Sequence, residues 1–235
     1  MIPRKLTLCL LCLLFTSGQI FAQRKPPAGG RVGVVVEERL AALRATPQLN
    51  GKLVRRLGRG RMVAIRSAKT TSDGVTFLLV NVTSRTHGWI QREAVASPAR
   101  TGDDQRLMRL IEDSQGFDRI ARARIFLDYF TRSPLRPDVL LLIGDTAEEL
   151  AAQLSTDATR RLKDDSGDAP EFSYYLNYTA LDRYNRQGVK FTFDKSTKRF
   201  HYDGAAWREL IRRYPKSSQV VEARKRLANS EGVSR

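Results

Sequence analysis

Residues 31–95 read RVGVVVEERLAALRATPQLNGKLVRRLGRGRMVAIRSAKTTSDGVTFLLVNVTSRTHGWIQREAV, and this stretch decides the fold. Short runs rich in β-branched residues alternate there with turn-forming Gly, Asn, Asp and Pro. Short strands separated by such turns are typical of small barrels and sandwiches. The pattern therefore predicts a small β-barrel, closed or nearly closed, over residues 31–96. Its strands are expected at Val32–Val36, Lys52–Leu57, Arg61–Ile65, Thr76–Val82 and Gly88–Gln91.

Three short motifs in this stretch follow the order found in a known family. They are Leu40-Ala-Ala-Leu43-Arg44-Ala-Thr-Pro47, Val54-x-x-Leu57-x-x-Gly60-x-x-Val63-x-Ile65, and Gly88-Trp89-Ile90 with Val95. Their order resembles the bacterial SH3-like domain. The resemblance implies an SH3-like β-barrel that binds cell-wall peptides or proline-containing segments through exposed aromatic side chains. The family usually carries a Trp in the middle strand, and Phe77 stands nearest to that position here.

The candidate ligand-binding residues are the aromatic and basic side chains of this stretch. Trp89 is either a peptide-contacting aromatic or a core residue at the end of the last strand, and Phe77 has the same two alternatives. Alternation along a strand places Arg55 on the face opposite Val54, so the basic residues are expected to coat one solvated side. A basic surface without a dedicated ligand is the alternative. The candidates are Trp89, Phe77, Arg44, Arg55, Arg56 and Arg61.

Residues 1–22 have the order of a secretory signal peptide. Arg4 and Lys5 precede the apolar run Leu6–Phe15, and Ala22 offers a small residue at the cleavage point. The run is shorter than the roughly 20 residues that cross a bilayer as a helix, so no transmembrane segment is expected in the mature chain. Residues 23–30 contain Pro-Pro and Gly-Gly and are expected to form a linker. We therefore expect cleavage near Ala22 and a periplasmic or secreted protein.

Charge and composition restrict the chemistry. The formal net charge is +16, and loss of Arg4 and Lys5 with the signal peptide leaves +14, which favours an acidic partner. Both cysteines lie in the signal peptide, and the two histidines do not have metal-site spacing. No cofactor, metal or catalytic residue is therefore expected. Export makes nucleic acid an unlikely partner, although basic and aromatic residues interleave in residues 189–214.

The hydrophobic period changes from two to 3.6 near residue 100. Residues 97–102 are therefore expected to link the barrel to an antiparallel helical domain over residues 103–235, whose first helix Asp103 or Asp104 caps. A short aromatic hairpin is expected at residues 189–202. The run Ala205-Ala-Trp207-x-x-Leu210-Ile-x-x-Tyr214-Pro215-x-Ser217, followed by Ala223-x-x-x-Leu227, resembles a tetratricopeptide-type helical hairpin of bacterial envelope assembly proteins.

These observations predict an α+β multidomain protein of the cell envelope that binds and does not catalyse. The SH3-like domain is expected to dock to cell-wall peptide, peptidoglycan or a protein segment. The tetratricopeptide-like helical region is expected to bind an envelope protein. The alternative is a peptidoglycan-active hydrolase, or the targeting subunit of one. That alternative needs a nucleophile, a metal site or a carboxylate pair, and no such motif is visible in the sequence.

Overall fold

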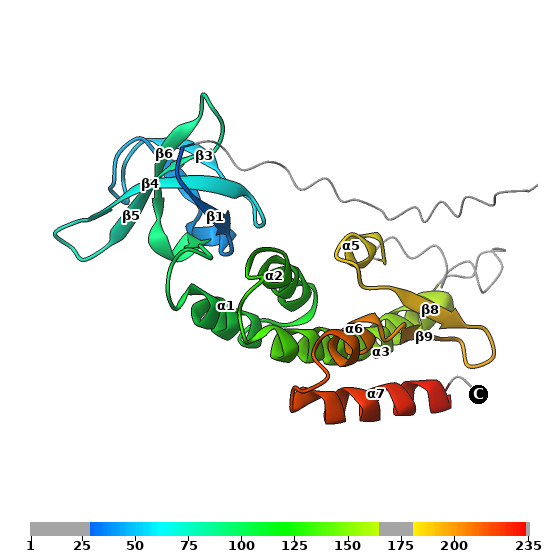
Figure 1. Ribbon diagram of the computed structural model, residues 1–235. Coiled ribbons are helices and arrows are strands. Elements are labelled where there is room, and N and C mark those ends of the chain that lie inside the picture. The colour runs from blue at the N-terminus through cyan, green and yellow to red at the C-terminus, as the bar shows by residue number, and fades with distance from the viewer. Residues whose placement is uncertain (1–28, 165–180, 234–235) are drawn as a thin grey trace, which may run out of the picture.

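The computed structural model describes residues 29–164 and 181–233, which form an α+β protein (Figure 1). The predicted fold class is confirmed at that level. A curled antiparallel sheet lies at one end of the molecule, and the helices extend away from it along the long helix α3 (Arg136–Asp164). The predicted signal peptide, residues 1–22, and residues 23–28 of the predicted linker lie outside the described residues.

Within the described part of the chain, seven strands form one sheet in the order β3-β2-β6-β5-β4-β1-β7. All five predicted strands are present, and β4 continues beyond its predicted end. The strands β2 and β7 were not predicted, because two or three residues are too few to show a period. The strands are β1 (Arg31–Val35), β2 (Ala42–Arg44), β3 (Leu53–Arg56), β4 (Met62–Thr70), β5 (Thr76–Asn81), β6 (His87–Gln91) and β7 (Val95–Ala96).

Of the two predicted forms of the barrel, the closed one is wrong, because among the described residues β3 and β7 form two separate edges of the sheet. The edge at β7 is occupied by a helix. Arg106 donates one hydrogen bond of 2.5 Å to the carbonyl of Val95 and another of 3.0 Å to that of Glu93. These carbonyl groups are therefore satisfied by a guanidinium instead of a further strand. The sheet still curls around a core, formed by Val35, Ala41, Leu43, Leu57, Val63, Ile65, Leu78, Val80, Val82, Ile90, Ala94 and Val95.

The helical half is built on α3. The helices α2 (Gly116–Tyr129) and α6 (Ala205–Arg213) pack against it, α1 (Asp103–Glu112) packs on α2, and α7 (Gln219–Val233) packs on α6. The predicted hairpin is confirmed as β8 (Phe191–Asp194) and β9 (Arg199–Tyr202), and β9 lies against α3. The short helix α5 (Leu181–Asn185) precedes it. Trp207 is buried, on the face of α6 that also carries the buried Leu210.

Three residues of the sheet half extend the hydrophobic core of the helices. Val34, Val36 and Ala96 belong to the same buried cluster as Leu107 and Ile111 of α1. The sheet half is therefore packed directly on the helices, as Figure 1 shows.

The predicted linker, residues 97–102, is a short connection held at its first residue. Ser97 donates its N–H to the carboxylate of Asp103 at 2.8 Å and its hydroxyl to the carbonyl of Val32 at 2.6 Å. The N-cap position of α1 is Gly102 instead of Asp103 or Asp104 and makes no side-chain cap hydrogen bond, but Asp104 accepts the N–H of Gln105 in the first turn at 2.9 Å. The Asp103 carboxylate is held instead by the Ser97 N–H and the Arg106 guanidinium.

Candidate functional site

One row of side chains crosses the outer face of the sheet. The register pairs Leu53 of β3 with Arg44 of β2, Arg44 with Trp89 of β6, Trp89 with Leu79 of β5, and Leu79 with Ser67 of β4. Paired residues of neighbouring strands project to the same face. All five are exposed or half-buried, whereas Leu43, Leu78 and Ile90, which alternate with them, are fully buried. The row therefore lies on the solvent side of the sheet.

Arg44 and Trp89 form the centre of this row, and the local backbone explains their approach. A Cβ atom on Gly88 would lie 2.7 Å from the carbonyl oxygen of Arg44, so only glycine allows β2 to pair this closely with β6. Arg44 donates a hydrogen bond of 2.8 Å to the carbonyl of Gly51, which fixes its side chain across the β2–β3 loop. Arg44 and Trp89 are thus paired neighbours on one face, and the Arg44 guanidinium is held toward the β2–β3 loop.

The other predicted residues lie in three different settings. Phe77 is only 1% exposed, so its ring does not reach the surface. Arg61 is half-buried and donates a hydrogen bond of 3.3 Å to the carbonyl of Val82. Arg55 and Arg56 are exposed on β3, next to the row. The structure therefore places Arg44 and Trp89 in the row, with Arg55 and Arg56 exposed on the neighbouring edge strand, and leaves Phe77 and Arg61 apart from it. Arg55 pairs with the buried Leu43 and so projects to the face opposite the row.

The strand β3 is a free edge with apolar side chains. It pairs only with β2 among the described strands, and all four of its residues are exposed. Leu49, Leu53 and Val54 are between 46% and 49% exposed, although large aliphatic side chains usually lie inside. Leu49 and Leu53 were not among the predicted site residues. The signal for them was the run Leu53-Val-Arg-Arg56, which lacks the strict alternation of a half-buried strand.

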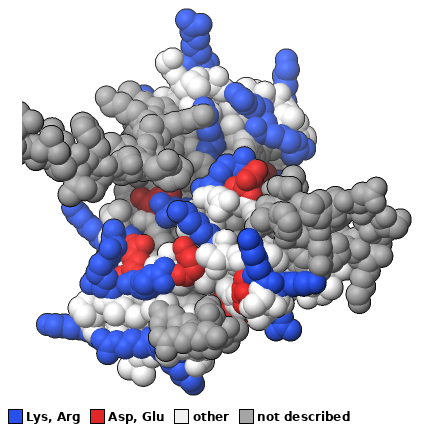
Figure 2. Space-filling model, turned by 90° about the vertical axis from the view of Figure 1, so that its right-hand side faces the viewer, with Lys and Arg blue, Asp and Glu red and all other residues white. Residues whose placement is uncertain are grey.

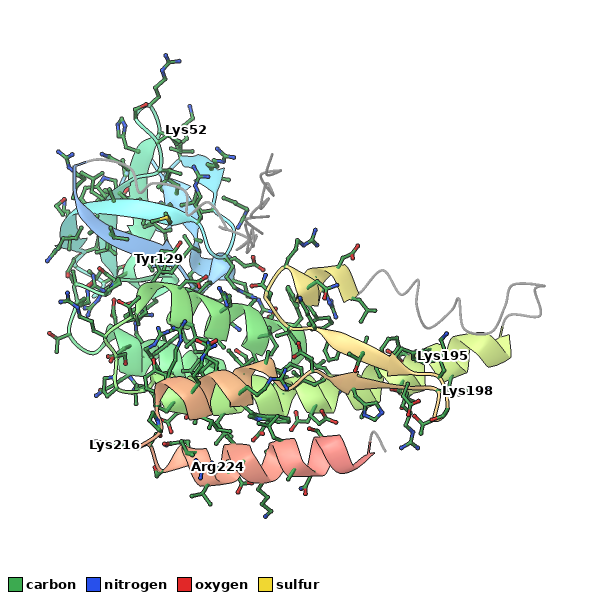
Figure 3. All side chains as sticks on the ribbon, turned by 45° about the vertical axis from the view of Figure 1, so that its right-hand side comes forward. Lys52, Tyr129, Lys195, Lys198, Lys216 and Arg224 are labelled. Atoms are coloured by element: carbon green, nitrogen blue, oxygen red, sulfur yellow. The ribbon has the colours of Figure 1, made fainter. Side chains whose placement is uncertain are left out.

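The charge around this edge has one sign. Residues 39–72 contain nine Lys or Arg and no Asp or Glu. Figure 3 shows Lys52 projecting at the end of the sheet, far from Lys195 and Lys198 on the loop of the hairpin. The two predicted groups of basic residues therefore do not merge into one surface. In the view of Figure 2, Lys and Arg project from the margins and Asp and Glu gather near the middle.

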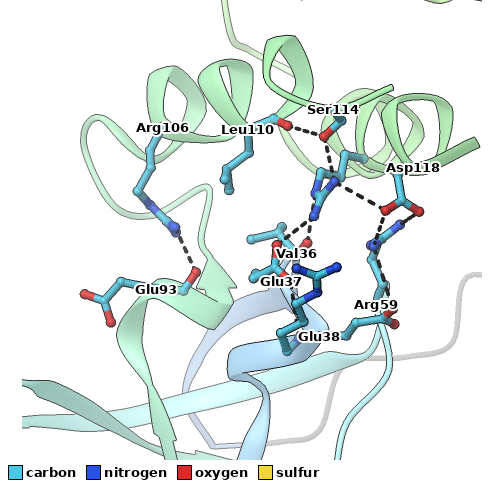
Figure 4. A network of polar contacts seen from close by, with 11 residues as sticks. Val36, Glu37, Glu38, Arg59, Glu93, Arg106, Leu110, Ser114 and Asp118 are labelled. Carbon is cyan, nitrogen blue, oxygen red and sulfur yellow. Dashed lines mark hydrogen bonds and ion pairs between the residues drawn. The ribbon is translucent and has the colours of Figure 1, made fainter. Parts of the chain in front are cut away.

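A polar cleft of about 510 Å³ lies between the sheet half and the junction where α1 ends and α2 begins. Arg122 of α2 reaches across it, bonding the Glu37 carboxylate at 2.7 Å, the Ser114 hydroxyl at 2.6 Å and the Val36 carbonyl at 3.3 Å (Figure 4). Arg59 crosses in the opposite direction and bonds both carboxylate oxygens of Asp118, at 2.8 and 3.3 Å. These pairs join the two halves of the protein, and we assign them a structural role.

The hydrogen bond from Arg59 holds the pKa of the Asp118 carboxyl below its ordinary value, with a further contribution from the positive charges of Arg59 and Arg122. The carboxylate therefore stays ionised in mildly acidic solution, and the contact between the halves keeps its charge there.

Within residues 29–164 and 181–233, no group of three His, Cys, Asp or Glu side chains is arranged to hold a metal ion. No helix in this part of the chain is long and apolar enough to cross a membrane. His87 is exposed at the start of β6, and His201 is half-buried in β9. No protein-family model matches the chain, and no curated protein or solved structure is significantly similar to it.

Proposed function

We propose that this protein is a non-enzymatic binding protein of the bacterial cell envelope, exported to the periplasm or beyond. Its sheet half is SH3-like in its motifs and docks to cell-wall peptides or to protein segments. Its helical half is tetratricopeptide-like and binds a protein partner. The observation that carries the proposal is the pairing of Arg44 with Trp89 on the outer face of the sheet, beside the free edge β3.

The geometry suits binding in two ways. An indole that is half-buried presents a rigid apolar surface at low entropic cost, and aromatic and Arg side chains are the commonest anchors of protein interfaces. Arg44, paired with Trp89 in the sheet, adds charged donors to the same face, and one of its nitrogens is already fixed to Gly51. An extended segment carrying a carboxylate and an apolar side chain would match this pair of groups.

Co-sedimentation of the mature protein with purified peptidoglycan, over a series of salt concentrations, tests the proposal together with a pull-down from envelope extract. In at least one of these two assays we expect binding that persists at moderate salt. The affinity should fall at least tenfold in the Trp89→Ala variant. Arg85→Ala is the control, because Arg85 is an exposed cation on the β5–β6 loop, outside the row. Circular dichroism confirms that both variants are folded.

Three results would overturn the proposal. Binding lost at moderate salt in both variants would mean that the net charge alone is responsible. Binding that is equal in Trp89→Ala and in the unchanged protein would remove the row from the site. Release of soluble muropeptides during the incubation would favour the alternative function, a peptidoglycan-active hydrolase.

A further inference from the structure

We propose that the sheet half binds an extended acidic segment of a partner protein, which adds to β3 as a further strand of the sheet. This inference rests on the proposed function, in that it takes the sheet half as the binding half. It adds the chemical class of the partner and the mode of contact. The argument uses the backbone of β3, its side chains and its charge.

The backbone of β3 has hydrogen-bonding groups on its free side. Leu57 donates its N–H to the carbonyl of Ala41 at 2.9 Å, and Lys52 accepts at 2.9 Å from the N–H of Ala45, so both residues direct these groups toward β2. The direction alternates along an antiparallel strand, and the register shift of the β2–β3 pair places one extra residue between Lys52 and Leu57, so the alternation is counted from the nearer of these two residues. The N–H and C=O groups of Leu53 and Arg56 therefore face away from β2. No strand of the described chain pairs with them.

Free strand edges bind extended peptides by hydrogen bonding to their backbone, while side-chain contacts select the sequence. The strand β3 spans four residues, about 13 Å at the usual rise of a strand, which is long enough for a short segment. Leu53 and Val54 offer apolar contact along the edge, being 46% and 48% exposed. Neither nucleic acid nor lipid has the alternating N–H and C=O groups that this edge matches.

The charge selects an acidic partner and excludes a second copy of this chain at the same edge. Lys52, Arg55 and Arg56 lie on or directly before β3, and no carboxylate occurs between residues 39 and 72. Two copies meeting edge to edge at β3 would bring these cations together, and like charges on paired strands destabilise the pairing. Charged side chains on edge strands prevent self-association in the same way. A segment carrying Asp or Glu meets attraction instead.

The test uses the mature full-length protein and three capped octapeptides. The first alternates Glu and Val. The second has the same sequence but is N-methylated at its four central residues. Neither side of the extended peptide then keeps its central backbone N–H donors. The third alternates Lys and Val. Affinity is measured by calorimetry, and hydrogen exchange is followed at the amides of Leu53 and Arg56.

We expect the Glu–Val peptide to bind and to slow exchange at Arg56. The N-methylated peptide should bind at least tenfold more weakly, and the Lys–Val peptide should not bind. The double variant Arg55→Glu/Arg56→Glu should lose at least tenfold in affinity. Arg212→Glu/Arg213→Glu is the matched control, because it reverses two adjacent exposed cations at the end of α6 with the same change in net charge. That variant should bind within about twofold of the unchanged protein.

Equal binding of the N-methylated peptide would overturn strand addition, because charge alone would then account for the affinity. Failure of the Glu–Val peptide to bind, in a protein that still shows Trp89-dependent binding to envelope material, would overturn this inference and leave the proposed function standing. Failure in both assays would overturn both. An equal loss of affinity in the two double variants would also contradict the assignment of the site to β3.

Discussion

Gly144 of α3 lies directly beneath the indole ring of Trp207 of α6, and a Cβ atom at position 144 would lie 2.1 Å from Nε1 of that ring. The helices α3 and α6 pack closely because this position has no side chain. Trp207 also contacts the ring of Tyr202 edge-on, with 5.4 Å between centroids. The glycine inside a long helix thus makes room for the central aromatic side chain of the helical half.

The first prediction is that Gly144→Ala destabilises the protein. Ala normally stabilises a helix interior by about 1 kcal/mol relative to Gly, but overpacking of a core costs about 1–3 kcal/mol. Because the new methyl group overlaps the indole, we expect a net loss of free energy of unfolding, measured in urea by tryptophan fluorescence. Gly58→Ala is the control, since nothing lies within 4 Å of a Cβ built there. A Gly144→Ala variant as stable as the unchanged protein would refute the contact.

The second prediction concerns the ion pair between the two halves. The Arg122 side chain is 9% exposed and bonds Glu37 at 2.7 Å. Arg122→Met leaves Glu37 without its cation, and breaking a buried pair in this way costs about 3–5 kcal/mol. The double variant Arg122→Met/Glu37→Gln should recover part of that loss. Arg124→Met is the control, because Arg124 makes an exposed pair with Asp128 on the same helix and should cost less than about 1 kcal/mol.

The third prediction is a pH dependence carried by Asp118. Its pKa is lowered from an ordinary value of 3.8 by the hydrogen bond from Arg59. A lowered pKa in the folded state contributes stability above the unfolded pKa, and this contribution is lost as the pH falls through the folded pKa. Asp118→Asn should therefore reduce the loss of stability between pH 5 and pH 2. Since the carboxylate is about half exposed, the difference should stay under about 1 kcal/mol. Parallel denaturation curves of the two proteins over this range would contradict the assignment.

The fourth prediction concerns a buried arginine at the junction of three helices. Arg136 donates hydrogen bonds to the hydroxyl of Tyr214 at 2.7 Å and to the carbonyl of Leu127 at 2.6 Å. Tyr214→Phe removes an acceptor from a buried guanidinium, which should cost about 1–3 kcal/mol in thermal or urea denaturation. Tyr129→Phe is the matched control, because no hydrogen bond from the Tyr129 hydroxyl is found within the described chain (Figure 3). Equal stability of the two variants would contradict the role of Tyr214.

The strands show which parts of the sheet could be predicted from local sequence pattern. In the seven-stranded sheet, the five strands of four residues or more were predicted from their β-branched residues and turns, and the hairpin before α6 was predicted from its alternating aromatics. The strands β2 and β7 were missed because they depend on partners far along the chain. Arg44 enters the sheet by pairing with Trp89, and Val95 by pairing with Val35.

For the candidate site, sequence alone singled out Trp89 and Arg44, which the structure pairs on the outer face of the sheet, and Arg55 and Arg56, which it leaves exposed on the edge strand β3. It also singled out Phe77, which is buried, and Arg61, which bonds the Val82 carbonyl. It did not single out Leu49 or Leu53. An aromatic side chain of a sheet faces solvent only where no other element covers it. The sequence of one strand does not show which elements will cover it.

The sequence by itself determined the fold class, the change from strands to helices near residue 100, the apolar stripe of α6 and the absence of carboxylates from residues 39–72. These features depend only on residues close together in the sequence, because the hydrophobic period and the charge of a segment are visible within a few turns of helix or a few strands. Tertiary contacts settled that the sheet is open and β3 a free edge among the described strands, that Arg122 reaches Glu37 and that Gly144 lies beneath Trp207. These depend on contacts between residues far apart in the chain, whose meeting is set by packing of whole elements.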